Sequence, residues 1–314
     1  MDNLIFSLNA TVPVFMMMIL GMLFKKLGWI SDTFASQMNK FVFLVPLPVL
    51  LFEDLATTDF TQVWDGRFVV FCFVVTLMSI TIAALISFLL KERTIQGEFI
   101  QASYRSSAAL LGIALMQNIY GSAAMAPLMI IGSVPLYNIM AVIVLSFFQP
   151  DRKKLDLALF KKTLQGIVTN PIILGIVMGL SWSLLKLPMP TILHKTVSSI
   201  GSIATPLGLM AMGASFQIGK TMKKIKPIIL ATFMKLIGFC ILFLPIAIGL
   251  GFQTEKLVAI LVMLGSATTV SSFVMAKNMN HEGTLTSGVV MLTTLLSGFT
   301  LTLWIFILRS FGVI

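Results

Sequence analysis

The chain has 314 residues, of which 57% are hydrophobic and only 11% are charged, and its mean hydropathy is +0.99. This composition excludes an ordinary soluble protein and indicates an integral membrane protein. The formal net charge of +10 is also compatible with a nucleic-acid partner, so the placement of the basic residues has to decide between the two.

Apolar runs long enough to cross about 30 Å of hydrocarbon predict ten membrane-spanning helices. No cleavable signal peptide is expected, because the first residues lack a basic region and run directly into an apolar segment. In chain order, the predicted helices lie near residues 4–24, 38–56, 67–90, 98–119, 122–148, 163–185, 190–215, 226–250, 255–276 and 284–308.

The sequence repeats with an offset of 158 residues, about half its length. Five predicted helices fall in residues 1–150 and five in 163–314, and residues 151–162 form a polar linker between them. An odd number of crossings inverts the second repeat relative to the first, which is typical of secondary transporters. The repeat rests on the pairs Pro13 and Pro171, Gly21 and Gly179, and Pro48 and Pro206.

Basic residues gather in alternate loops. With the N-terminus outside, 15 of the 22 lysines and arginines fall in inner loops and 5 in outer loops, while Arg105 and Lys235 fall inside apolar segments. Membrane proteins keep positive residues on the cytoplasmic side, so no nucleic-acid partner is needed to explain the net charge. The pattern predicts a multi-pass protein with both termini outside; the basic linker could also contact lipid headgroups.

Prolines interrupt the second and seventh segments. Pro46 and Pro48 lie within 38–56, and Pro206 lies within 190–215. Proline removes a backbone donor, so both helices should kink or unwind there. At membrane depth such a defect is tolerated only where it is buried in protein or faces water.

The fourth and ninth segments carry polar, glycine-containing runs near the predicted bilayer centre, at 101–112 and 265–272. This pattern suits a discontinuous helix pair whose freed amides bind an anionic group, although small residues also serve close helix packing. The residues expected to bind substrate are Tyr104, Arg105, Ser106, Ser107, Asn138, Ser266, Thr268, Thr269, Ser271 and Ser272.

Two cations lie inside apolar segments. Arg105 is placed about 10 Å deep and Lys235 about 13 Å from the inner edge. Arg105 should face protein or a water-filled cavity. Lys235 is a candidate charge partner for a substrate carboxylate, or it extends towards the inner face. Glu53 and Asp54 either bind a coupling cation or lie just outside the membrane.

No cofactor, metal or nucleotide is expected, since the sequence holds no phosphate-binding glycine loop, and Cys72 and Cys240 lack metal-ligand or redox spacing. The segments also lack a buried aspartate pair, a histidine-rich motif or a serine–histidine arrangement, so the chain is predicted not to be an enzyme.

Along nearly its whole length the chain resembles the auxin efflux carrier family of membrane transporters, in its bacterial branch. The resemblance is carried by short motifs whose order and spacing agree with the family. These are 44–52, Tyr104-Arg105-Ser106-Ser107 with 112–114, Asn170-Pro171, 206–209 with 213–215, 271–277, and 293–297 with Thr300-Leu301.

The resemblance implies an all-α integral membrane fold of ten transmembrane helices in two inverted five-helix repeats, with helices 4 and 9 broken and crossing. Helices 1, 2, 6 and 7 would form a scaffold that dimerises, and helices 3–5 and 8–10 a mobile transport domain. Ser107 stands where the family usually has asparagine, and Ala114 and Ala267 where crossover prolines are common.

The leading hypothesis is a secondary active transporter of the bacterial cytoplasmic membrane that moves a small organic anion, a carboxylate, by an elevator-type mechanism. A sodium-coupled organic-anion symporter of related fold is the first alternative. The second is a membrane sensor that binds a ligand without moving it. The sequence predicts the architecture of a carrier, and leaves substrate, coupling ion and direction open.

Overall fold

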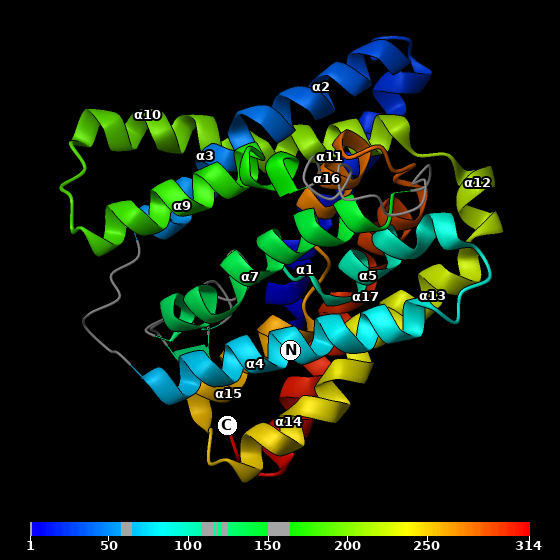
Figure 1. Cartoon of the computed structure of the whole chain (residues 1–314). Helices are drawn as coiled ribbons and strands as arrows, with labels where there is room; N and C mark the ends of the chain where they lie inside the picture. Colours follow the sequence, from blue (N-terminus) through cyan, green and yellow to red (C-terminus); the bar gives the residue numbers. More distant parts are fainter. Residues whose placement is uncertain (1, 58–64, 108–115, 117–118, 121–124, 150–163) are drawn as a thin grey trace.

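The computed structural model describes residues 2–57, 65–107, 116, 119–120, 125–149 and 164–314, and every regular element in these ranges is helical (Figure 1). The elements are α1 (Asp2–Lys26), α2 (Asp32–Leu44), α3 (Pro46–Ala56), α4 (Gly66–Ser87), the 3₁₀ turn η1 (Arg93–Ile95), α5 (Gln96–Tyr104), α7 (Ala126–Phe147), α9 (Pro171–Leu184), α10 (Thr191–Ser202), α11 (Ala204–Ser215), α12 (Ile218–Lys223), α13 (Ile225–Phe233), the π turn η2 (Met234–Gly238), α14 (Phe239–Gly249), α15 (Thr254–Gly265), α16 (Ser271–Asn278) and α17 (Thr284–Ser310).

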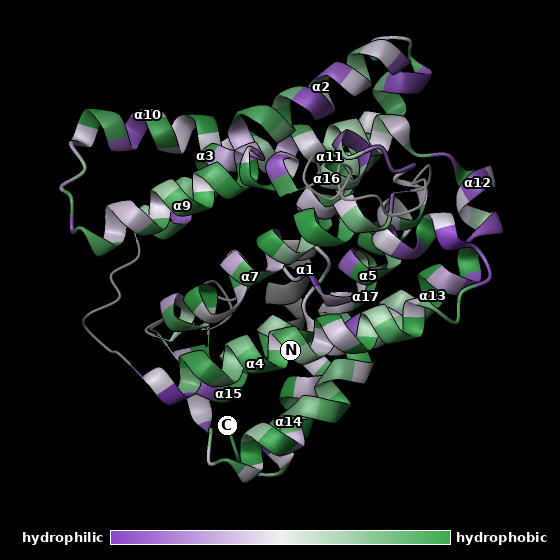
Figure 2. Ribbon diagram, viewed as in Figure 1, coloured by the Kyte–Doolittle hydropathy of each residue, from purple (hydrophilic) through white to green (hydrophobic). Residues whose placement is uncertain are grey.

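Six helices of the described part are long and apolar enough to cross a membrane. Apolar residues cover most of their length, and hydrophilic residues gather at turns and on α12 (Figure 2). The six correspond to the second, third, fifth, seventh, eighth and tenth predicted segments, so a multi-pass membrane protein is confirmed. They are Asp32–Ala56, Gly66–Ser87, Ala126–Phe147, Thr191–Ser215, Ile225–Gly249 and Thr284–Ser310.

The second segment is interrupted beside its prolines, as predicted, and the seventh divides into α10 and α11 at Ile203, which keeps helical dihedral angles. Val45 leaves helical geometry at φ −126° and ψ −72°, and Pro46 opens α3. Pro48 and Pro206 are each the third residue of the helix that follows the break. A proline is tolerated there, because the first-turn amides of a helix have no acceptor within it.

Helix boundaries recur at the offset found in the sequence. α3 begins at Pro46 and α11 at Ala204, which are 158 residues apart (204 − 46). α7 begins at Ala126 and α17 at Thr284, again 158 apart (284 − 126). These helix starts therefore follow the same offset as the residue pairs in the sequence.

Glycines bring the two halves of the chain into contact. α1 packs on α11, and α9 packs on α3. A Cβ at Gly179 would lie 2.8 Å from the Phe52 carbonyl oxygen, and one at Gly21 would collide with the Met210 carbonyl oxygen. The two glycines are 158 residues apart (179 − 21), and so are Phe52 and Met210, whose carbonyl groups they meet (210 − 52). The same close contact between helices therefore occurs twice. In Figure 1, α2, α3, α9, α10 and α11 lie together above α4, α13, α14 and α15.

Ion pairs fix one polar end of the bundle. Lys224, between α12 and α13, lies 2.6 Å from Glu282 and 3.4 Å from Glu92. Burial alone would raise the pKa of Glu282, but the hydrogen bond and charge of Lys224 outweigh it and hold that pKa below its ordinary value. Nearby, the buried Glu98 carboxylate accepts a 2.8 Å bond from the Gly283 amide. These contacts join α5, α13 and the loop between α16 and α17.

Candidate functional site

Two helices stop part-way along their predicted spans. α5 ends at Tyr104, and Arg105 is extended with φ −72° and ψ 133°. α15 ends at Gly265, Ser266 is extended with φ −79° and ψ 165°, and α16 begins at Ser271. The predicted interruption of 255–276 is thus observed. Most of the second half of 98–119, including Ala114, lies outside the described residues.

The two extended segments contact each other, and the second also contacts α5 and α17. The Ser107 amide donates to the Ala267 carbonyl oxygen at 2.9 Å. The Thr268 hydroxyl donates to the Ala102 carbonyl oxygen at 2.8 Å, and the Thr268 amide to the Thr293 hydroxyl oxygen at 3.0 Å. Ala267 is non-helical although it is not proline, because the partner segment satisfies its carbonyl group.

Arg105 lies beside this contact and is only 2% exposed. One terminal nitrogen, Nη2, donates to Asn138 Oδ1 at 2.6 Å and to Ser271 Oγ at 2.8 Å. The other, Nη1, lies 2.7 Å from Met275 Sδ. Its Nε has no hydrogen-bond partner, and among the described residues no carboxylate forms an ion pair with Arg105.

A buried cation without an anionic partner is costly, because its lost hydration is only partly replaced by neutral dipoles. Asparagine and serine orient the guanidinium without neutralising it. An arginine presents donors in a planar fork that matches a carboxylate. The geometry therefore favours an anion beside Arg105.

Arg105 lines a cavity of about 80 Å³. Since roughly 10–15 Å³ of such space holds one water, it has room for several waters or a small organic molecule. Six of the residues predicted to bind substrate line the cavity, and these are Arg105, Ser106, Ser107, Asn138, Thr269 and Ser271.

The remaining wall residues were not among those that the sequence assigned to the substrate site, although some lie on the same helices. α2 and α3 supply Val42, Leu47, Leu50, Leu51 and Asp54, α11 supplies Ala204 and Thr205, α7 supplies Val134 and Tyr137, and the α16 region supplies Val270 and Val274. The two proline-associated breaks were the available signal, because Leu47 and Thr205 directly precede Pro48 and Pro206.

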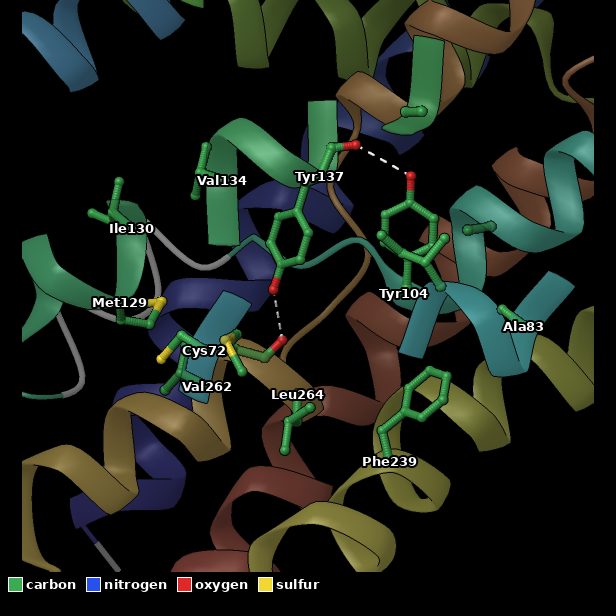
Figure 3. Packing of buried hydrophobic residues seen from close by; sticks show 14 of the residues in the cluster. Cys72, Ala83, Tyr104, Met129, Ile130, Val134, Tyr137, Phe239, Val262 and Leu264 are labelled. Carbon is green, nitrogen blue, oxygen red and sulfur yellow. Dashed lines mark hydrogen bonds between the residues drawn. The ribbon is translucent and has the colours of Figure 1, made fainter. Parts of the chain in front are cut away.

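Four other predicted site residues are not among the cavity walls: Tyr104, Ser266, Thr268 and Ser272. Tyr104 instead donates through its hydroxyl to the Tyr137 carbonyl oxygen at 3.2 Å, and the Tyr137 hydroxyl donates to the Met263 carbonyl oxygen at 3.2 Å (Figure 3). This chain of bonds joins α5, α7 and the end of α15. These bonds hold together three helices beside the cavity.

Lys235 is also absent from the cavity walls and is fully buried. Its Nζ donates to the Leu264 carbonyl oxygen at 2.5 Å and to the Ser106 hydroxyl oxygen, and lies 3.4 Å from the Met263 carbonyl oxygen. The side chain therefore turns inward to the end of α15 and does not extend to the inner face.

Within the described ranges, no group of three or more histidine, cysteine or acidic side chains could hold a metal ion. Cys72 and Cys240 are both buried and unpaired with one another.

An apolar helical bundle with an arginine-lined cavity beside two interrupted helices is the arrangement expected of a membrane transporter. Residues 6–305 match the family described as "Membrane transport protein", and the chain belongs to this family, which is the auxin efflux carrier-like family indicated by the sequence motifs. Its members are transporters and not enzymes. No curated protein sequence matches the chain.

Proposed function

We propose that the protein is a secondary active transporter that moves a small organic anion, a carboxylate, across the bacterial cytoplasmic membrane. The single observation that carries this proposal is Arg105, a buried guanidinium on the cavity wall that has no carboxylate partner among the described residues. A bound carboxylate would supply the missing negative charge.

The surroundings of Arg105 support a small carboxylate over other anions. Thr269 and Ser271 bring hydroxyl donors from the start of α16, where the helix dipole also favours negative charge. Leu47, Leu51 and Val134 give the cavity an apolar side that suits a short hydrocarbon chain. The ligand that fits has one carboxylate and few further polar atoms.

The position of the cavity supports an elevator-type mechanism. In this proposal α1–α3 and α9–α11 form the scaffold, and α4, α5, α7 and α13–α17 form the transport domain. The scaffold supplies Leu47 and Thr205 to the cavity, and the transport domain supplies Arg105 and Asn138. A ligand held by Arg105 would travel with the transport domain past the scaffold wall.

The proposal includes two inverted five-helix repeats, both termini outside, and a homodimer formed through the scaffold helices. The recurrence of helix boundaries at 158 residues supports the repeats. Exposed apolar side chains on α9 and α10, among them Val177 and Ile192, are available for lipid or for a second copy.

Arg105→Met tests the proposal, because methionine keeps much of the side-chain volume and removes the charge. Loss of charge-assisted hydrogen bonds worth about 1.5–3 kcal/mol should weaken anion binding roughly 10- to 150-fold. The measurement is the thermal shift of purified protein with a panel of short mono- and dicarboxylates, since a ligand that binds the folded state raises its melting temperature.

Arg67→Met is the matched control. Arg67 is exposed at the start of α4, donates to the Leu250 carbonyl oxygen at 2.8 Å, and is not among the cavity walls. Its loss should leave affinity unchanged. If Arg105→Met and the unmodified protein bind the carboxylates with equal affinity, Arg105 does not bind the anion. Saturable uptake into proteoliposomes supports a carrier, whereas binding without flux supports a ligand sensor.

A further inference from the structure

Lys235 lies at a local defect of the eighth predicted segment. The chain changes from α13 to the π turn η2 at Met234, and the Phe239 amide donates to the Met234 carbonyl oxygen five residues earlier. The Trp304 side chain of α17 donates to the Leu236 carbonyl oxygen at 3.1 Å. A π turn of this kind often marks a functional position in a helix, and here it presents Lys235 to the end of α15.

Several hydrogen-bond acceptors lie together at the end of α15. Because the helix stops at Gly265, carbonyl groups of its last turn have no amide partner within the helix, and the helix dipole makes this end negative. The Met263 carbonyl oxygen accepts from the hydroxyl groups of Ser106 and Tyr137. The Leu264 carbonyl oxygen accepts from Lys235.

A close approach of two helices creates this arrangement. A Cβ at Gly265 would lie 2.7 Å from Cys240 Sγ and 3.7 Å from the Leu236 carbonyl oxygen. Only glycine therefore lets the end of α15 lie against η2 and α14. The ammonium group of Lys235 then meets two main-chain carbonyl oxygens and one hydroxyl oxygen in a fully buried position.

This ligand set is the chemistry that binds a small monovalent cation. In transporters with broken helices, unwound carbonyl groups and half-helix C-termini coordinate the coupling cation. Here the carbonyl oxygens of Met263 and Leu264 and the hydroxyl oxygen of Ser106 face the ammonium group of Lys235. Among the described residues, Lys235 has no ion-pair partner that would explain its charge otherwise.

We propose that Lys235 is a tethered cation that occupies a monovalent-cation site at the end of α15, so that the crossing of the two broken helices is held together without sodium. This proposal rests on the proposed function and adds to it the ion requirement of the same helix crossing. The test reads stability and not anion transport, so its failure is distinguishable from failure of the carrier proposal.

Lys235→Ala removes the ammonium and leaves a space of similar size. Its melting temperature in choline chloride should fall below that of the unmodified protein, and ammonium or methylammonium chloride at equal ionic strength should raise it by about 3–5 °C. Choline is too large to enter. The unmodified protein should melt at the same temperature in sodium chloride and in choline chloride.

Two further variants separate a cation site from general salt effects. Lys235→Met fills the space without charge, so ammonium should not raise its melting temperature. Lys40→Ala removes an exposed lysine of α2 and should behave as the unmodified protein does. The proposal is overturned if Lys235→Ala shows no ammonium-specific rise. It is also overturned by a sodium-specific rise in the unmodified protein, a measurement that needs no variant to fold.

Discussion

Two charges of opposite sign line the same cavity. The Arg105 guanidinium comes from the extended segment after α5, and the Asp54 carboxylate from α3. In the proposed elevator these residues belong to the moving part and the stationary part respectively. A ligand carboxylate that sits beside Arg105 therefore also experiences repulsion from Asp54, and this repulsion weakens as the proposed transport domain carries the ligand away from α3.

Asp54→Asn should tighten binding of an anionic ligand, because it removes a negative charge from the cavity and keeps the side-chain size. A charge on the wall of the same cavity contributes roughly 1–2 kcal/mol at the effective dielectric constant of a partly buried site, which corresponds to about a 5- to 30-fold change in affinity. Thermal-shift titration with the best carboxylate of the panel measures it.

Glu53→Gln is the control for this prediction. Glu53 is the neighbouring acid on α3, but it lies 3.8 Å from His194 of α10 and is not among the cavity walls. Its neutralisation should change affinity little. If Glu53→Gln and Asp54→Asn tighten binding equally, the effect comes from net charge and the local repulsion is absent.

Single residues differed in how well the sequence predicted them. Arg105 could be assigned because a cation in an apolar segment is expensive to bury and so requires a local reason. Asp54 could not, since a carboxylate near the end of a segment is equally compatible with solvent. Tyr137 reaches the cavity only through tertiary packing, for which one sequence contains no direct signal, whereas Thr205 directly precedes Pro206 and could have been found from that proline.

At the scale of helices, glycine decides how closely elements approach. Gly21→Ala and Gly179→Ala should each destabilise the protein by about 1–3 kcal/mol, because the added methyl group meets main-chain atoms that cannot move aside easily. Thermal unfolding of the detergent-purified protein measures the loss, and the repeat relation predicts that both variants lose stability.

Gly249→Ala provides the comparison. Gly249 is the last residue of α14, and a Cβ there would meet no atom within 4 Å. Alanine is also the better helix former by about 1 kcal/mol. This variant should melt at or slightly above the temperature of the unmodified protein. A comparable fall in Gly249→Ala would mean that helix contacts are not the cause.

Most helix positions followed from the sequence, because apolar length and proline placement are local properties. The break at 266–270 followed from its small polar residues. The π turn around Lys235 did not, since the residues of η2 contain no helix breaker and the defect depends on Trp304 and the end of α15. Such defects arise from neighbours and not from the segment itself.

At the scale of the molecule, the proposed scaffold and the proposed transport domain meet where α11 packs against α16. A Cβ at Gly208 would lie 3.3 Å from Val274 Cγ2. In a background with Cys72→Ala and Cys240→Ala, a disulfide between Gly208→Cys and Val274→Cys should stop uptake into proteoliposomes, because it fixes the moving part to the stationary part. Reduction should restore uptake.

Each single-cysteine variant serves as its control and should keep its flux under the oxidant. Undiminished flux in the fully cross-linked double variant would argue that α16 does not slide past α11. The contact itself could not be foreseen from the sequence, because the repeat specifies which elements are alike and not which elements touch.

The paired glycine contacts have a consequence for how the two halves of the chain depend on each other. α1 of the first half rests on α11 of the second, and α9 of the second rests on α3 of the first, through the related pairs Gly21–Met210 and Gly179–Phe52. Each half of the chain thus packs a glycine-containing helix against a helix of the other half. The two contacts have the pairing of a symmetric dimer interface, in which residue i of one copy meets residue j of the other and j meets i.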